Sequence, residues 1–177
     1  MSVTSVNKWK YILKKSMSRM TTYGRFKEKN TSLYEKMAAN RTKFSESELE
    51  KWVPKNDKNT TLRDVFLSLP GYDDIGSLSV WMLENPASPI RLSGAIDLYE
   101  HDCVHCVLDR GLLNPDEAFV IGYTMGNDES LKSWEPNAYL FLASTFFPSY
   151  YSFNEKEKQV YFNGIELGRQ NSVKNIH

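Results

Sequence analysis

The sequence predicts an all-α protein folded as a multi-helix bundle, and two observations support this fold class. Apolar residues recur at spacings of three and four through most of the chain, which is the period of one buried helix face. No segment alternates apolar and polar residues as a half-buried strand would. With 177 residues, the chain is long enough for one domain with a substantial core.

The chain is expected to begin with an N-terminal arm, residues 1–59. Within it, residues 5–20 are predicted to form a basic amphipathic helix, whose apolar stripe comprises Trp9, Ile12, Leu13, Met17 and Met20. Sequences typical of a capping box begin at Ser32 and Ser45 and predict short helices there. A polar connection at residues 53–59 then leads into a helical core, residues 60–177.

Helices of the core are predicted from apolar periodicity and from helix-start and helix-stop residues. They cover about residues 62–69, 75–82, 93–109, a segment beginning at Asn114, 130–146 and 155–171. Pro70 and Gly111 mark two of the expected ends. The start at Asn114 is well marked, because Asn is a favoured cap and Pro115 suits the first helical position.

Composition narrows the classes of partner and of location. Basic and acidic residues balance at 22 each, so a nucleic-acid partner is not expected. Residues 1–29 nevertheless carry eight basic residues and one acidic residue, whereas the remaining chain carries 14 and 21. Two cysteines indicate a reducing, intracellular compartment. No run of 18 apolar residues predicts a membrane-spanning helix.

One short segment gathers nitrogen and oxygen ligands at a spacing that can hold a metal. His101 and His105 lie one turn apart on one predicted helix, and Asp102 falls within the same arc. Glu117 lies in the first turn of the next helix, at the loop end of the same hairpin. Imidazole and carboxylate ligands suit a divalent metal, zinc or iron. The sequence therefore predicts a metal site on a helical hairpin of the bundle.

A simpler interpretation of these residues is also open. His101, Asp102 and His105 lie on one side of the predicted helix with Asp97 and Asp109, as on the solvated face of an amphipathic helix. Glu117 has a local role of its own as the third-position partner of the Asn114 cap. Spacing alone does not decide between a metal site and a polar surface.

The pattern His-Asp-x-x-His, followed by eleven residues and Glu, is met at His101, Asp102, His105 and Glu117. It resembles the signature of the coenzyme Q (ubiquinone) biosynthesis protein four family. Around it, Leu69-Pro70-Gly71 upstream and Pro89 with Arg91 resemble the same family loosely. The resemblance spans about residues 60–170, although only residues 101–117 are specific. Asp116, where the family often has glycine, and the pair Cys103 and Cys106 depart from the pattern.

The resemblance implies that His101, Asp102, His105 and Glu117 are the metal ligands. It also implies a helical homodimer on a membrane surface, which binds a prenylated quinone precursor or another lipid. The activity implied is metal-dependent oxidative decarboxylation of a prenylated aromatic ring. The location implied is cytoplasmic or peripheral on a membrane, or mitochondrial in a eukaryote.

Several alternatives stay open at this point. One alternative is a non-catalytic lipid-binding or scaffold module that keeps the metal for stability. A zinc hydrolase fits less well, because Asp102 would replace the longer Glu that usually acts as the base. Cys103 and Cys106 are expected to pack as small apolar residues. Residues 1–29 are expected to bind a membrane, to dock on protein, or to serve as a presequence.

Overall fold

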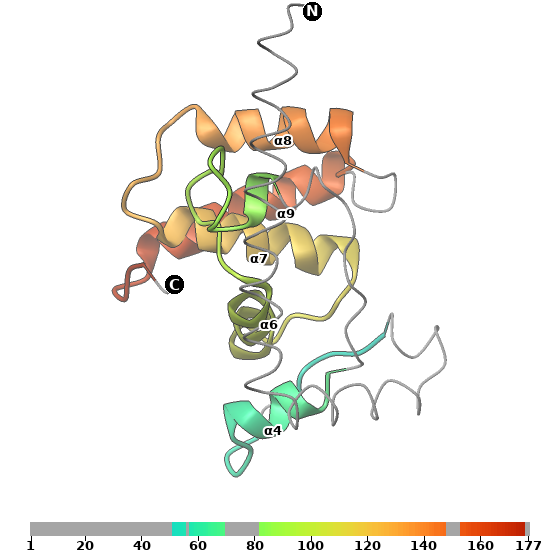
Figure 1. Cartoon of the computed structure of the whole chain (residues 1–177). Helices are drawn as coiled ribbons and strands as arrows, with labels where there is room; N and C mark the ends of the chain where they lie inside the picture. Colours follow the sequence, from blue (N-terminus) through green and yellow to red (C-terminus); the bar gives the residue numbers. More distant parts are fainter. Residues whose placement is uncertain (1–50, 56, 70–81, 148–152, 176–177) are drawn as a thin grey trace, which may run out of the picture. The chain divides into compact units, whose positions relative to one another are not determined.

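The computed structural model describes residues 51–55, 57–69, 82–147 and 153–175 (Figure 1). All of them belong to the second of two compact units, Met37–His177. Within these ranges the regular elements are helices and none is a strand, which confirms the all-α prediction. The helices are α4 (Leu62–Leu67), α6 (Leu98–Val107), α7 (Asn114–Asn127), α8 (Glu135–Phe146) and α9 (Glu155–Gln170).

Part of the prediction lies outside the described residues. This applies to the amphipathic stripe within residues 5–20, to the starts at Ser32 and Ser45, and to most of the helix at 75–82. Only residues 82–84 of that last helix are described, and they are helical. The division of the chain into residues 1–59 and 60–177 stays a prediction.

Helix α6 is shorter than predicted. It was expected from about Ser93, but it begins at Leu98 because Asp97 caps it. The Asp97 carboxylate accepts from the Glu100 amide at 2.9 Å, and the Glu100 carboxylate accepts from the Asp97 amide at 3.1 Å. Gly94 has a φ of +80°, which interrupts any helix before this capping box.

The starts of α7 and α8 also differ from the prediction. Asn114 is the first residue of α7, and Leu113 is its cap, in extended backbone conformation and without a side-chain bond. Helix α8 begins at Glu135 and not near residue 130, because the Glu135 carboxylate accepts from the Lys132 amide at 2.8 Å and closes a turn there. Helix α9 agrees with the prediction and is capped by Asn154.

Helices α7 and α9 touch through their backbones. Gly122 and Gly126 on α7 face Gly164 and Gly168 on α9. A Cβ added at Gly122 would lie 2.1 Å from the Tyr161 carbonyl oxygen, so side chains are excluded there. This contact fixes α7, the helix that carries Glu117, against α9.

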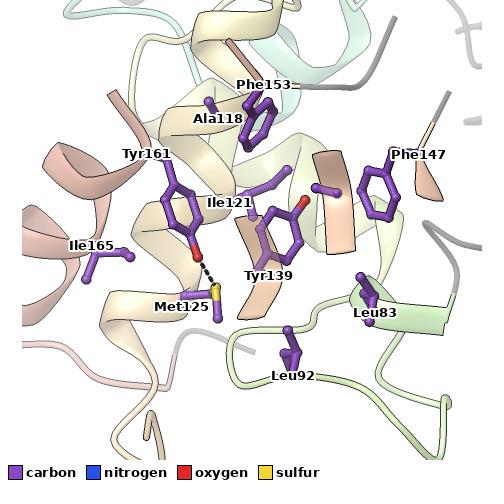
Figure 2. Close-up of a cluster of buried hydrophobic side chains, with 11 residues drawn as sticks. Leu83, Leu92, Ala118, Ile121, Met125, Tyr139, Phe147, Phe153, Tyr161 and Ile165 are labelled. Carbon is purple, nitrogen blue, oxygen red and sulfur yellow. Dashed lines mark hydrogen bonds between the residues drawn. The ribbon is translucent and has the colours of Figure 1, made fainter. Parts of the chain in front are cut away.

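The main core cluster joins Leu83 and Leu92 with α7, α8, α9 and the segments after α8 (Figure 2). Tyr139 and Tyr161 stack with ring centroids 5.5 Å apart, and the Tyr161 hydroxyl donates to the Met125 sulfur at 2.8 Å. The cluster comprises Leu83, Leu92, Ala118, Ile121, Met125, Tyr139, Ala143, Phe147, Phe153, Tyr161 and Ile165. No helix among the described residues is long and apolar enough to span a bilayer.

The aromatic stretch after residue 138 divides between core and surface. Tyr139, Phe147 and Phe153 are buried in the main core cluster. Phe141 and Phe146 on α8 are 66% and 62% exposed. Tyr150 and Tyr151 lie outside the described residues.

Candidate metal centre

The hairpin of α6 and α7 brings three of the four predicted ligands together. His101 and His105 lie on α6 one turn apart, with their ring centroids 4.7 Å from each other. The carboxylate of Glu117, in the first turn of α7, lies between them. Its Oε2 is 3.5 Å from His101 Nε2, and its Oε1 is 3.4 Å from His105 Nε2. One ligand atom from each of the three residues fits within 4.8 Å.

The triad, defined as His101, His105 and Glu117, is buried. The side chain of His105 is 0% exposed, and those of His101 and Glu117 are 15% and 17% exposed. The interpretation of this face of α6 as a solvated surface is therefore wrong at His101 and His105, whereas Asp109 is exposed. The reason is that α7 covers it, which helical periodicity within α6 could not reveal.

Ring nitrogens of both buried imidazoles lack hydrogen-bond partners. Nε2 of His101 and both ring nitrogens of His105 have no hydrogen-bond partner among the described residues. The distances of 3.4 and 3.5 Å to the Glu117 carboxylate exceed the 2.7–2.9 Å typical of a charge-assisted bond. Burying such polar atoms without partners costs about 1–3 kcal/mol each. An additional group between them would remove this cost.

The spacing of the triad is that of metal ligands. Ligands about 2.0–2.2 Å from a tetrahedral zinc ion lie roughly 3.3 Å from one another. The two N···O distances of 3.4 and 3.5 Å match this value. Two imidazoles and one carboxylate also form a common donor set for zinc or iron. The residues present therefore fit a divalent metal, although the donor set does not identify the ion.

The electrostatics of the triad keep one imidazole available as a ligand. Burial lowers the pKa of His101 to about 4, more than the Glu117 carboxylate raises it. Burial also opposes protonation of His105, but the nearby charges of Glu117 and Asp102 raise its pKa above the ordinary value. For Glu117, burial is outweighed by the two histidines, which lower its pKa. At neutral pH His101 is thus neutral, and Glu117 is ionised.

Asp102, the fourth predicted ligand, lies apart from the triad. Its Oδ1 is 4.0 Å from Nδ1 of His101, whereas Nε2 of the same ring faces Glu117. Burial, with repulsion from Glu117 and Asp97, raises the pKa of Asp102 to about 7. In metal sites, a carboxylate beside the second nitrogen of a ligating histidine orients the ring. At 4.0 Å the Asp102 carboxylate is beyond hydrogen-bond distance of His101, so an orienting role and a role as a direct ligand both stay predictions.

The loop between α6 and α7 is held by several contacts. Asp109 has a φ of 54°, which turns the chain after α6. The guanidinium of Arg110 lies 3.8 Å from the centroid of the Phe119 ring and 3.6 Å from the Asp116 carboxylate. A Cβ at Gly111 would approach the Trp52 carbonyl oxygen to 2.6 Å. These contacts fix the loop that sets the distance between His105 and Glu117.

A partly buried polar pair, Glu84 and Tyr139, was not predicted from the sequence. The hydroxyl of Tyr139 on α8 donates to Oε1 of Glu84 at 2.6 Å. Burial raises the pKa of Glu84 to about 7, against the hydrogen bond from Tyr139, and repulsion from Glu117 raises it further. No motif joins Glu84 to the other residues, because the pair forms only when α8 packs on the segment around Leu83.

The cysteines behave as small packing residues. Cys106 is 0% exposed, Cys103 is partly exposed, and neither forms a disulfide. Burial, with repulsion from Cys103 and Asp102, raises the pKa of Cys106 to about 12. A thiol with so high a pKa is a poor nucleophile at neutral pH.

Comparisons of the chain with protein-family models, curated proteins and solved structures give no significant match. The arrangement of the triad on α6 and α7 is therefore the observation from which a function is argued.

Proposed function

We propose that this chain is a metal-binding helical protein that holds one zinc or iron ion at His101, His105 and Glu117. The observation that carries the proposal is the buried triad, in which unsatisfied nitrogens lie 3.4 and 3.5 Å from carboxylate oxygens. Burying these unpartnered nitrogens and the carboxylate costs free energy, whereas a cation bound between them would interact favourably with all three side chains. We propose that Asp102, whose Oδ1 lies 4.0 Å from His101 Nδ1, orients His101 when the ion is bound.

Metal content tests this proposal directly. Wild-type protein should purify with about one zinc or iron ion per chain, measured by elemental analysis. His105→Ala and Glu117→Gln should each lose most of it, because a missing ligand rarely has a substitute nearby. Glu166→Gln changes an exposed acid on α9 and serves as the control. Equal metal content in all four proteins would refute the site.

We infer further that the site serves chemistry on a prenylated aromatic ring, as in ubiquinone-type biosynthesis. This inference rests on the resemblance of the His-Asp-x-x-His motif and Glu117 to the coenzyme Q biosynthesis protein four family. When bound, the ion would supply a Lewis acid for a ring carboxylate or oxygen. The chain's own part is to keep His101 neutral and Glu117 ionised, so that both present lone pairs at neutral pH.

The ring chemistry has its own test. Metal-loaded protein is incubated aerobically in detergent with a prenylated hydroxybenzoate, and carbon dioxide release and product mass are measured. In the expected reaction the ring carboxyl group leaves as carbon dioxide and a hydroxyl group takes its place, while dioxygen, the two-electron oxidant, is reduced to hydrogen peroxide. Metal-loaded wild type that leaves this substrate unchanged would reject the decarboxylase, without affecting the metal site.

A non-catalytic lipid-binding or scaffold module is the second candidate. It is favoured by the exposed Phe141 and Phe146 on α8, in a stretch, residues 136–153, that carries no charged side chain. The same proposal includes a homodimer and attachment to a membrane surface. Co-sedimentation with anionic vesicles, with and without residues 1–29, tests attachment by the basic arm. Light scattering in the same buffer tests the dimer.

A further inference from the structure

Arg110 makes contacts with both helices of the hairpin that carries the triad. Its backbone belongs to the end of α6, where Leu108 is the cap and Asp109 follows with a φ of 54°. In this type of helix end, the amide of the second residue beyond the cap bonds back into the last turn. The Arg110 amide accordingly donates to the His105 carbonyl at 3.0 Å. The backbone of Arg110 is therefore fixed to the residue that carries one of the two imidazoles.

The side chain of Arg110 contacts α7 at two residues. Its Nη1 is 3.6 Å from the Asp116 carboxylate, and its guanidinium carbon lies 3.8 Å from the centroid of the Phe119 ring. These two residues stand on either side of Glu117 in the chain, and because they are three apart they share one face of α7. Successive residues of a helix differ in direction by about 100°. Holding that face of the first turns therefore also fixes the direction in which Glu117 projects.

The two side-chain contacts of Arg110 differ in strength. The side chains of Arg110 and Asp116 are 36% and 23% exposed, and an ion pair so open to solvent stabilises little by itself. Phe119 is only 8% exposed, and a cation over the face of a buried ring is held more strongly. The ring contact is therefore the main attachment of Arg110 to α7, and the ion pair with Asp116 adds direction to it.

We propose that Arg110 is a positioning residue of the metal site, which holds Glu117 at the distance from His105 that a bound cation requires. The inference rests on the proposed metal site, and Arg110 itself is not a ligand. It acts through Asp116 and Phe119 on one side of the hairpin and through its own amide on the other. Ligands that are already in place bind more tightly, because less ordering remains to be done on binding.

The sign of the effect separates positioning from simple electrostatics. A guanidinium repels a divalent cation, so charge alone predicts that Arg110→Gln would bind the metal more tightly than wild type. Positioning predicts the opposite, a loss of affinity of about tenfold, as when an outer group that orients a ligand is removed. Phe119→Leu changes no charge, and positioning predicts a loss of about threefold from the missing cation–π contact. Because both substitutions remove the same attachment, the double variant should bind about as weakly as Arg110→Gln alone.

The experiment is a titration of the full chain with cobalt(II), which accepts the same kinds of ligand as zinc and whose visible absorption depends on its coordination geometry. Wild type, Arg110→Gln, Phe119→Leu, the double variant and the control Arg169→Gln are compared after circular dichroism has shown equal helix content. The control removes an exposed arginine from α9. Arg110→Gln should bind cobalt about tenfold more weakly and with a changed visible spectrum, and the control should match wild type in both.

Urea unfolding of the metal-free proteins separates positioning from a role in folding alone. If Arg110 only stabilises the loop, Arg110→Gln would unfold at lower urea but keep the affinity and spectrum of wild type. That result, or tighter binding by Arg110→Gln, would overturn the positioning role and leave the metal site intact. Should Arg110→Gln not fold, Phe119→Leu decides by the same two readouts. Wild type that binds no cobalt would overturn the metal site itself.

Discussion

His105 Nε2 lies 3.4 Å from Glu117 Oε1 across the loop between α6 and α7. His105 is completely buried, and the contact is too long for a strong charge-assisted hydrogen bond. The two groups nevertheless shift each other's pKa, upward for His105 and downward for Glu117. This relationship is the one expected of two ligands in the proposed metal site.

The Asp102→Asn variant tests whether Asp102 orients His101 or binds the metal directly. Because Asp102 lies 4.0 Å from the His101 nitrogen that faces away from Glu117, we expect the variant to keep one metal per chain. Its affinity should fall about 10- to 100-fold, as when an outer partner of a ligating histidine is lost. The measurement is a zinc competition titration beside His105→Ala. Loss of metal as complete as in His105→Ala would make Asp102 a direct ligand.

Acid should destabilise the metal-free protein through His101. Its pKa is about 4 in the folded chain, against an ordinary value of 6.5. The unfolded chain therefore binds more protons between these values, so stability falls as the pH drops from 6.5 to 4. The loss attributable to His101 is about 3 kcal/mol, at 1.36 kcal/mol per pH unit.

Urea unfolding of chelator-treated protein at pH 4, 5, 6 and 7 measures this loss. His101→Gln should show a shallower fall in the free energy of unfolding than wild type, and the control Asn163→Ala should not. A His101→Gln variant with the wild-type slope would contradict the expectation.

Gly126→Ala should destabilise the fold strongly. The added Cβ would lie 2.1 Å from the Ile165 carbonyl oxygen, so α7 and α9 must move apart. Such overpacking costs about 2 kcal/mol or more, equivalent to a fall of roughly 4–8 °C in Tm for a chain of this size. Ser144→Ala, at an exposed position of α8, is the control in a thermal unfolding experiment. Equal Tm values would show that the helices do not touch at Gly126.

Asn154→Ala should cost about 1 kcal/mol of stability. The Asn154 side chain accepts from the Lys156 amide at 2.9 Å and from the Glu157 amide at 3.3 Å, at the start of α9. Asn163→Ala makes the same chemical change at an exposed position inside α9 and should cost much less. Urea unfolding of both variants measures the difference, and equal costs would argue against the cap.

The all-α class and α9 could be predicted because their signals are local. Asn154 with Glu157, for example, forms a capping box within four consecutive residues. The starts of α6 and α8 were misplaced because capping contacts within four residues set them, Asp97 with Glu100 and Lys132 with Glu135, and contacts distant in sequence add to these. Gly94 donates to Asp128 at 2.8 Å, and Glu135 accepts from Ser93 at 2.8 Å, so residues 93–97 are held out of helix.

At the candidate site, too, local spacing could be predicted from the sequence and contacts between helices could not. His101, His105 and Glu117 could be proposed from spacing, because one helical turn and one short loop fix their separation. The burial of this face and the position of Asp102 depend on how α7 crosses α6. The hydrogen bond between Tyr139 and Glu84 could not be predicted at all, because Tyr139 comes from a helix distant in sequence.

The glycine contact between α7 and α9 bears on how relatives of this chain could be found. Gly122 and Gly126 follow Glu117 on the same helix. Their Gly-x-x-x-Gly spacing is repeated by Gly164 and Gly168 on α9. The close backbone contact at these glycines restricts sliding and rotation of α7. A shift of the helix register by one residue would turn Glu117 by about 100°. We therefore expect divergent homologues to preserve the two glycine pairs together with His101, His105 and Glu117, even where overall identity has vanished. A search for both patterns at once would be far more selective than either alone.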